Sequence, residues 1–173
     1  MQVWRICRAL FAAEAFSGEG ARRFGGRWNS RGMPMVYASS SLALAAIELF
    51  VHLDPNQQPD DLVYVSAALP AGEPLRSVAE KDLPASWWLM ENSAGLEATR
   101  ALGDAWVKAG ESLAMEVPSA ALRPERNVLI NPAHEAVKEI VVADPVPFVF
   151  DARMFTSRAT RRSSSHAQRK GAR

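Results

Sequence analysis

The most informative stretch of this 173-residue chain is Arg22-Arg23-Phe24-Gly25-Gly26-Arg27-Trp28-Asn29-Ser30-Arg31-Gly32. Its two adjacent glycines allow a ligand to approach the backbone closely, and its four arginines concentrate positive charge within ten residues. Because a planar guanidinium binds phosphate oxygens in pairs, a diphosphate would suit this stretch. A solvated basic loop explains the same residues equally well, so both interpretations stay open.

The stretch matches neither of two common nucleotide-binding motifs. The chain contains no G-x-x-x-x-G-K-[ST] sequence, which a P-loop requires. The neighbouring Gly18-Glu19-Gly20 does not continue into a Rossmann fingerprint, because position 23 is arginine and no strand leads directly into it. Both nucleotide-binding folds are therefore disfavoured.

Apolar patterns on either side of this stretch predict a mixed α+β domain over residues 1–152. The three hydroxyls of 39–41 predict the start of a helix that runs to about Leu53, and a second helix is expected over 94–109 with Gly110 as its C-cap. Residues 17–32 are expected to form a long loop. Strands are predicted over 3–7, 35–38, 62–69, 113–117, 127–130, 138–143 and 146–150.

The overall composition is that of an ordinary globular protein, with 48% apolar and 23% charged residues. Cys7 is the single cysteine, so no intrachain disulfide can form and nothing indicates an oxidising compartment. The first residues lack the basic and apolar regions of a signal peptide, and the longest apolar stretch, 42–53, is too short to span a bilayer. We expect a cytoplasmic protein that is not associated with membranes.

The C-terminal end differs in charge from the rest of the chain. From Arg153 onward there are seven basic and no acidic residues, which leaves 13 basic and 19 acidic side chains in residues 1–152, about −6 in formal charge. Few apolar residues follow Phe155, so we expect 153–173 to be a flexible basic tail that aids solubility. A contact with nucleic acid or an acidic partner is the alternative, although the acidic body is a poor nucleic-acid surface.

Glu48 is the second candidate functional residue. It is the one acidic residue of the first predicted helix, and helical spacing places it on a narrow face with Ser41, Ala45 and His52. That face is either the solvated side of an amphipathic helix or a place where a carboxylate acts beside the arginine-rich stretch. In the second interpretation Glu48 is a general base or stabilises a cation.

A third group of polar residues lies later in the chain. Ser119 lacks the G-x-S-x-G elbow of a nucleophilic serine, and a serine after proline is usually a turn hydroxyl. Asn127 and Asn131 bracket a predicted strand and are explained equally by loop capping. The histidines and Cys7 lack zinc-ligand spacing, so no metal is expected.

Five blocks of the sequence together resemble the RES domain, a family named for its Arg, Glu and Ser. They occur in the family's order over about residues 3–150, and several separate blocks are more specific than any one of them. The blocks are Gly25-Gly26-Arg27-Trp28-Asn29, Tyr37-Ala38-Ser39, Ala46-Ile47-Glu48, Val117-Pro118-Ser119 and Asn127-Val128-Leu129-Ile130-Asn131-Pro132-Ala133-His134.

This resemblance implies a single RES domain with a mixed, mostly antiparallel sheet flanked by helices, similar to ADP-ribosyltransferase toxins. RES proteins are typically toxins of bacterial toxin–antitoxin pairs, and the partner is an antitoxin with an Xre-like helix-turn-helix domain. The implied reaction cleaves the nicotinamide–ribose bond of NAD and passes ADP-ribose to water or phosphate. A protein acceptor is the alternative, and nucleic acid would be reached only indirectly, through the antitoxin.

The resemblance also implies roles for individual residues. The family's Arg, Tyr, Glu and Ser fall on Arg27, Tyr37, Glu48 and Ser119, and NAD-binding positions fall on Arg5, Arg27, Tyr37 and Asn127. Glu48 would bind ribose hydroxyls and stabilise positive charge on the sugar. Arg27, with Arg5 assisting, would bind the diphosphate. Tyr37 would pack against the nicotinamide ring, and Ser119 would contact the nicotinamide or the ribose.

Two hypotheses of other classes stay open. A non-catalytic module would use the arginine-rich stretch to bind an anionic ligand without consuming it. A toxin acting on nucleic acid would use the basic tail and residues 22–31, and its affinity would fall steeply with salt. Trp87 and Trp88 are expected to pack in the core, with an interface as the alternative.

Overall fold

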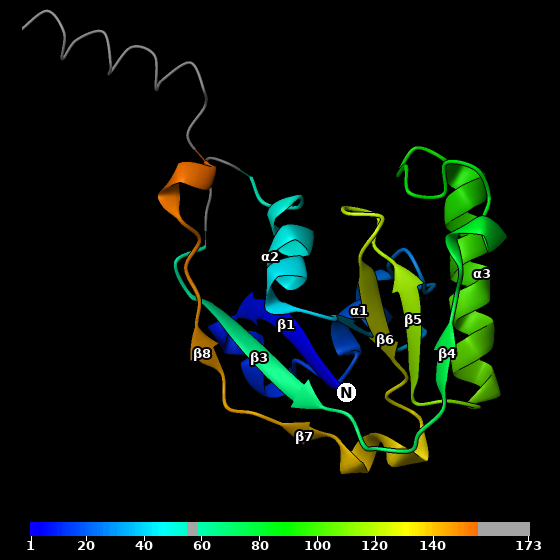
Figure 1. Cartoon of the computed structure of the whole chain (residues 1–173), viewed down its shortest axis with the longest axis horizontal. Helices are drawn as coiled ribbons and strands as arrows, with labels where there is room; N and C mark the ends of the chain where they lie inside the picture. Colours follow the sequence, from blue (N-terminus) through cyan, green and yellow to red (C-terminus); the bar gives the residue numbers. More distant parts are fainter. Residues whose placement is uncertain (55–58, 156–173) are drawn as a thin grey trace, which may run out of the picture.

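One sheet organises the described part of the chain, residues 1–54 and 59–155 of a computed structural model (Figure 1). Its strands are β1 (Gln2–Arg8), β2 (Val36–Ser39), β3 (Leu62–Ala68), β4 (Leu75–Ser77), β5 (Ala114–Pro118), β6 (Arg126–Ile130), β7 (Val141–Val142) and β8 (Val146–Pro147). Within these residues the order is β4-β5-β6-β2-β1-β3-β7, with β8 also pairing with β3. In the described ranges only β4 and β5 pair in parallel, so the α+β class and the mostly antiparallel sheet are confirmed.

The centre of the sheet is fully buried, which fixes the register of the strands that carry polar residues. Val128, Leu129 and Ile130 of β6 have no exposed surface. Val128 and Ile130 belong to one apolar cluster and Leu129 to another, so both faces of β6 are covered. A slip of one residue would exchange these side chains between the two faces and disrupt both clusters. The register pairs Tyr37 with Leu129 and Ser39 with Asn127.

Two predicted helices are present with nearly the expected bounds. Helix α2 (Leu42–Phe50) begins after Ser41, whose Oγ accepts a hydrogen bond from the Leu44 amide at 3.1 Å. It ends three residues before the predicted end, because tighter bonds close residues 51–53 into a turn. Helix α3 (Ser93–Ala109) ends at Gly110, which has φ +62° as a left-handed cap. In Figure 1, α2 stands beside β1, and α3 runs along β4 and β5.

The predicted long loop of 17–32 is wrong in part, because it contains helix α1 (Glu19–Phe24). Glu19 forms ion pairs of 2.6 Å with Arg22 and Arg23, the i,i+3 and i,i+4 spacings that face one another on a helix. These two arginines hold the pKa of Glu19 down at about 2. The signal that predicts α1 is therefore the spacing of its charged residues, because the segment has no apolar periodicity.

The strand predictions for the last third of the domain were too long. Residues 135–139 form a short 3₁₀ helix, and pairing with β3 is confined to the two-residue strands β7 and β8. Prolines explain the short pairing, because a proline lacks the amide hydrogen that a ladder bond needs. The short strand β4 was not predicted, since its three residues are all exposed and show no alternation.

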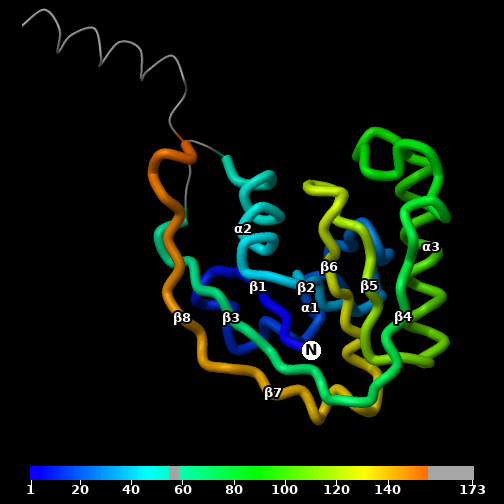
Figure 2. Tube along the Cα trace, in the orientation of Figure 1, coloured from blue at the N-terminus to red at the C-terminus, as the bar shows by residue number. Residues whose placement is uncertain are grey.

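Residues 146–155, here called the C-terminal strap, pass β3 and then run beside α2 (Figure 2). Phe150 of the strap lies with its ring centroid 5.8 Å from that of Phe50 on α2 and 4.9 Å from that of Phe148. The ring of Phe155 is tilted against that of Phe50, with the two centroids 5.2 Å apart. The strap thus covers the C-terminal half of α2 with aromatic side chains.

Most of the predicted basic tail, residues 156–173, lies outside the described residues. Arg153 is described, and it pairs with Asp151 at 2.6 Å. None of the helices in the described ranges has the length and apolar content to cross a bilayer. Trp87 is buried in the core beneath α3 and Trp88 packs against it, which confirms the expected core packing.

Candidate active site

Glu48 lies on α2 with its carboxylate held by two residues from the opposite hairpin. Its Oε1 accepts a hydrogen bond of 2.6 Å from the Ser119 hydroxyl and another from the Asn127 side-chain amide. In the described part of the chain, no hydrogen bond reaches Oε2. One oxygen therefore fixes the carboxylate and the other remains available to a ligand.

The β5–β6 hairpin places Ser119 and Asn127 side by side. Ser119 directly follows β5, and its amide donates to Glu125 across the turn while its Oγ accepts from the Leu122 amide at 2.9 Å. Asn127 is opposite Val117 in the ladder, and its Oδ1 accepts from the Ser39 hydroxyl at 2.8 Å. Ser119 is fully buried. Its position favours contact with Glu48 over the nucleophile interpretation.

Arg27 is half-buried and points toward the segment before α3. Its Nη1 donates to the Trp87 carbonyl at 2.7 Å, and its Nη2 donates to the Trp88 carbonyl at 2.9 Å and to the Met90 sulfur at 3.0 Å. Burial lowers the pKa of Arg27, and the nearby negative charge of Glu48 opposes this shift. Arg27 and Glu48 are therefore close enough to interact electrostatically, although their side chains come from separate segments.

Tyr37 holds the Gly26–Asn29 segment in place. Its hydroxyl accepts from the Trp28 amide at 2.9 Å and donates to Asn29 Oδ1 at 2.7 Å. A Cβ on Gly26 would overlap this hydroxyl, so the close approach requires glycine. Burial raises the pKa of Tyr37 far above its usual value, which keeps the hydroxyl protonated as a donor.

Arg5 contacts the backbone of Tyr37. Its Nη1 donates to the Tyr37 carbonyl at 3.0 Å, and its Nε is enclosed without a partner among the described residues. Burial lowers the pKa of Arg5. Arg5 is therefore better suited to supplying fixed positive charge beside Tyr37 than to moving onto a bound diphosphate.

Helix α3 supplies contacts that the sequence did not predict. The hydroxyl of Thr99 donates to the Arg27 carbonyl at 2.8 Å, and Nε of Arg100 donates to the Gly26 carbonyl at 2.8 Å. Asp104 accepts from the Ser30 amide at 2.9 Å. These three residues occupy one helical face and fix the backbone of the glycine-rich segment. No local sequence signal connects them to residues more than 70 positions earlier.

The four arginines of the initial stretch do not act together. Arg22 and Arg23 are exposed and are both paired with Glu19. Arg31 is exposed, whereas Arg27 turns inward toward the Trp87 and Trp88 carbonyls. Of the four, Arg27 is the one whose charge interacts with that of Glu48 among the described residues. In the described ranges, no group of three or more His, Cys, Asp or Glu is arranged to hold a metal ion.

The structure thus brings together the sequence-predicted Glu48, Ser119 and Asn127. Arg27 lies within electrostatic reach of Glu48 and Tyr37, and Arg5 binds the Tyr37 carbonyl. The family model of the RES domain matches residues 2–151 of this sequence. The chain belongs to the RES domain family.

Relatives of this RES domain match over almost their whole length. A protein named Toxin Res from Photorhabdus laumondii is 31% identical over 155 residues, which are 89% of this chain and 97% of that protein. A protein named Prs ADP-ribosylating toxin from Sphingobium sp. is 34% identical over 156 residues, which are 87% of this chain and 94% of that protein.

The fold of this RES domain is also present in a solved structure. A chain from the crystal structure of the M. tuberculosis MbcT-MbcA toxin-antitoxin complex superposes with a TM-score of 0.61 over 89% of this chain and 86% of that chain. The two sequences share 17% identity, so this likeness shows a common fold.

Proposed function

We propose that this RES domain is a bacterial toxin that cleaves the nicotinamide–ribose bond of NAD and passes ADP-ribose to water or phosphate. The observation that carries the proposal is the Glu48 carboxylate, fixed through Oε1 by Ser119 and Asn127 and open at Oε2. The name of the Sphingobium relative, Prs ADP-ribosylating toxin, supports chemistry on NAD. It also keeps transfer of ADP-ribose to a protein as the second candidate.

Glu48 would act by stabilising charge. Breaking the bond to nicotinamide leaves positive charge on C1′ of the ribose, while the pyridine departs as a neutral molecule that needs no proton. The free Oε2 of Glu48 would accept from ribose hydroxyls and place negative charge beside this cation. Ser119 and Asn127 hold the carboxylate in advance, so little reorganisation is needed in the transition state.

The residues around Arg27 would bind and orient the substrate. The positive charge of Arg27 would attract the diphosphate, and Arg5 would add positive charge from its position at the Tyr37 carbonyl. Tyr37 would pack against the nicotinamide ring from its fixed position under Gly26. Holding the nucleotide in one orientation lowers the entropic part of the barrier.

A partner that blocks this site follows from the proposed chemistry, since unrestrained consumption of NAD would harm the cell that makes the enzyme. We propose a cytoplasmic protein paired with an antitoxin that has an Xre-like helix-turn-helix domain. The presence of a related fold in a toxin-antitoxin complex supports this proposal. Such an antitoxin would cover the entrance near Arg27, and nucleic acid would be reached through the antitoxin.

The direct test is release of nicotinamide from NAD by the purified full chain, measured with and without inorganic phosphate. We expect free nicotinamide together with ADP-ribose, or with ADP-ribose 1″-phosphate when phosphate is the acceptor. Binding of NAD in a calorimetric titration without any product would instead indicate a non-catalytic module. Transfer of label from NAD to a protein would favour the second candidate.

Ser119→Ala is expected to lower kcat roughly 10-fold, because a hydrogen bond to a charged group is worth about 1.5–3 kcal/mol and Asn127 still holds Oε1. Ser119 is paired only with groups of the protein itself, so KM for NAD should change little. A matched control is Ser17→Ala, which removes an exposed hydroxyl that donates to the Glu14 carbonyl and, among the described residues, contacts no residue of the site. An unchanged kcat in the Ser119 variant would show that this bond does not position Glu48.

A further inference from the structure

Arg100 is the one guanidinium near the proposed site that keeps its forked end free among the described residues. Its Nε donates to the Gly26 carbonyl at 2.8 Å, and no hydrogen bond or ion pair in the described ranges uses its two η nitrogens. By contrast, Arg27 donates three of its five N–H groups to Trp87, Trp88 and Met90. Arg100 therefore offers four N–H groups to a ligand, arranged in the geometry that matches phosphate oxygens.

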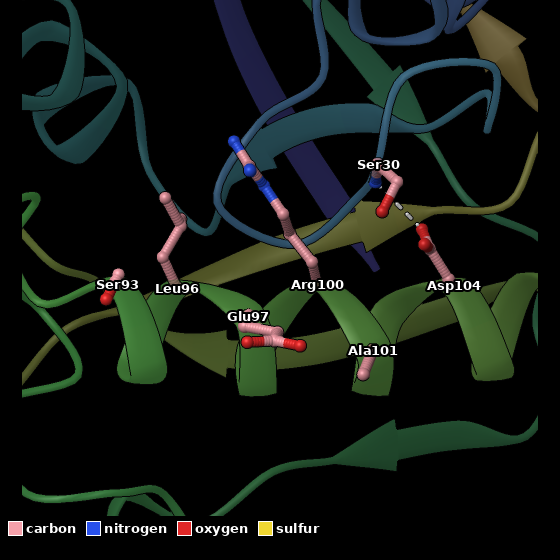
Figure 3. Close-up of a pocket in the computed structure, with 7 residues that line it drawn as sticks. All are labelled: Ser30, Ser93, Leu96, Glu97, Arg100, Ala101 and Asp104. Atoms are coloured by element: carbon pink, nitrogen blue, oxygen red, sulfur yellow. Dashed lines mark hydrogen bonds between the residues drawn. The ribbon is translucent and has the colours of Figure 1, made fainter.

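The position of Arg100 joins the glycine-rich segment to a pocket on the face of α3. The pocket has a volume of about 420 Å³ and is lined by Ser30, Ser93, Leu96, Glu97, Arg100, Ala101 and Asp104 (Figure 3). Glu48 is not part of this lining. The charge of Arg100 nevertheless acts on the pKa of both Arg27 and Tyr37. Arg100 thus lines the pocket and also lies near Arg27 and Tyr37.

Among the described residues, neither carboxylate of the pocket forms an ion pair with Arg100. Asp104 accepts from the Ser30 amide at 2.9 Å, and this bond is drawn in Figure 3. Glu97 is exposed and lies across the front of the helix in Figure 3, whereas Arg100 extends from the helix toward the segment that carries Ser30. The guanidinium is fixed at Nε by Gly26, so little side-chain entropy remains to be lost when an anion binds.

We infer that Arg100 is a binding residue for a phosphoryl group at this site. The inference rests on the proposed cleavage of NAD and adds to it the residue that recognises phosphate. Two sources share this chemistry, namely the diphosphate of the dinucleotide and free inorganic phosphate as the acceptor. Bidentate binding by a guanidinium suits either one, and an ammonium group cannot reproduce it.

The test compares Arg100→Gln with substrates that differ in phosphate content. Nicotinamide release is followed for NAD, for nicotinamide mononucleotide, which has one phosphate, and for nicotinamide riboside, which has none. Arg100→Gln should raise KM for NAD roughly 10- to 100-fold, with kcat within about twofold, as expected for lost charged hydrogen bonds. The kcat/KM for the riboside should stay at the wild-type value, which also shows that the variant is folded.

Two further variants separate charge, geometry and folding. Arg100→Lys keeps the charge but loses the fork, and we expect a KM for NAD between those of the wild type and Arg100→Gln. Lys108→Gln removes an exposed charge from the same helix and should leave every parameter unchanged. If Arg100→Gln does not fold, the Arg100→Lys comparison on the three substrates decides the question.

The outcomes distinguish this inference from the proposed function. Equal losses for NAD and the riboside would overturn it, because a structural role of Arg100 affects all substrates alike. An unchanged KM for NAD together with a raised half-saturating phosphate concentration would assign Arg100 to free phosphate. If wild-type protein releases no nicotinamide, titration with ADP-ribose and with inorganic phosphate decides. Weaker binding of either in Arg100→Gln but not in Lys108→Gln supports the inference, and equal binding overturns it.

Discussion

Replacing Glu48 with glutamine is expected to reduce nicotinamide release from NAD by about 10²- to 10³-fold, the loss typical of removing one preorganised electrostatic group. Glutamine has nearly the same shape, and its amide oxygen can still accept from Ser119 and Asn127. The change removes the negative charge and turns the free oxygen into a donor. The effect should therefore appear in kcat, measured from initial rates at saturating NAD.

The matched control is Glu139→Gln, which removes an exposed carboxylate at the end of the 3₁₀ helix 135–139. Its kcat should equal that of the wild type. The thermal midpoint of Glu48→Gln should lie within a few degrees of the wild-type value, because both hydrogen bonds are retained. Wild-type turnover in Glu48→Gln would refute the role proposed for the carboxylate.

Gly103→Ala should cause the largest loss of stability, about 1–3 kcal/mol in the free energy of unfolding. A Cβ at this position in α3 would overlap the carbonyl oxygen of Trp28, and this neighbour is backbone that cannot rotate away. The clash would push α3 from the segment that carries Arg27. A chain of this size loses about 2–4 °C in Tm per kcal/mol, which thermal unfolding followed by circular dichroism resolves.

Gly20→Ala is the matched control for this prediction. Gly20 lies in α1 and is exposed, and a Cβ at this position would have no other atom within 4 Å. Alanine is the better helix former by up to about 1 kcal/mol, so this variant should be as stable as the wild type or more so. If both variants had the same Tm, close packing of α3 on Trp28 would not contribute to stability.

The sequence predicted the features whose cause is local. Helix α2 has serine hydroxyls before an apolar run, which predict where it begins. Helix α3 has a glycine immediately after its last apolar position, which predicts where it ends. The strands β1, β3, β5 and β6 carry β-branched residues in buried runs. Helix α1 was missed because its stabilising contacts are ion pairs with Glu19, and β7 and β8 were overestimated because prolines shorten the pairing.

The resemblance names the residues of the candidate site but not their partners. Resemblance placed Arg27, Tyr37, Glu48, Ser119 and Asn127, and the structure gathers them. The resemblance could not indicate that Arg27 binds a carbonyl 60 residues later, or that Arg100 binds the Gly26 carbonyl. Those contacts depend on how α3 packs across the glycine-rich segment, which no local spacing encodes.

The C-terminal strap makes one face of α2 depend on the end of the described chain. Every residue assigned to the site precedes position 131, yet the rings that pack on Phe50 come from Phe150 and Phe155. Positions 48 and 50 of a helix point in nearly opposite directions, so these rings cover a face of α2 that is turned away from Glu48. During synthesis, that face of α2 therefore lacks its aromatic cover until residue 155 has left the ribosome.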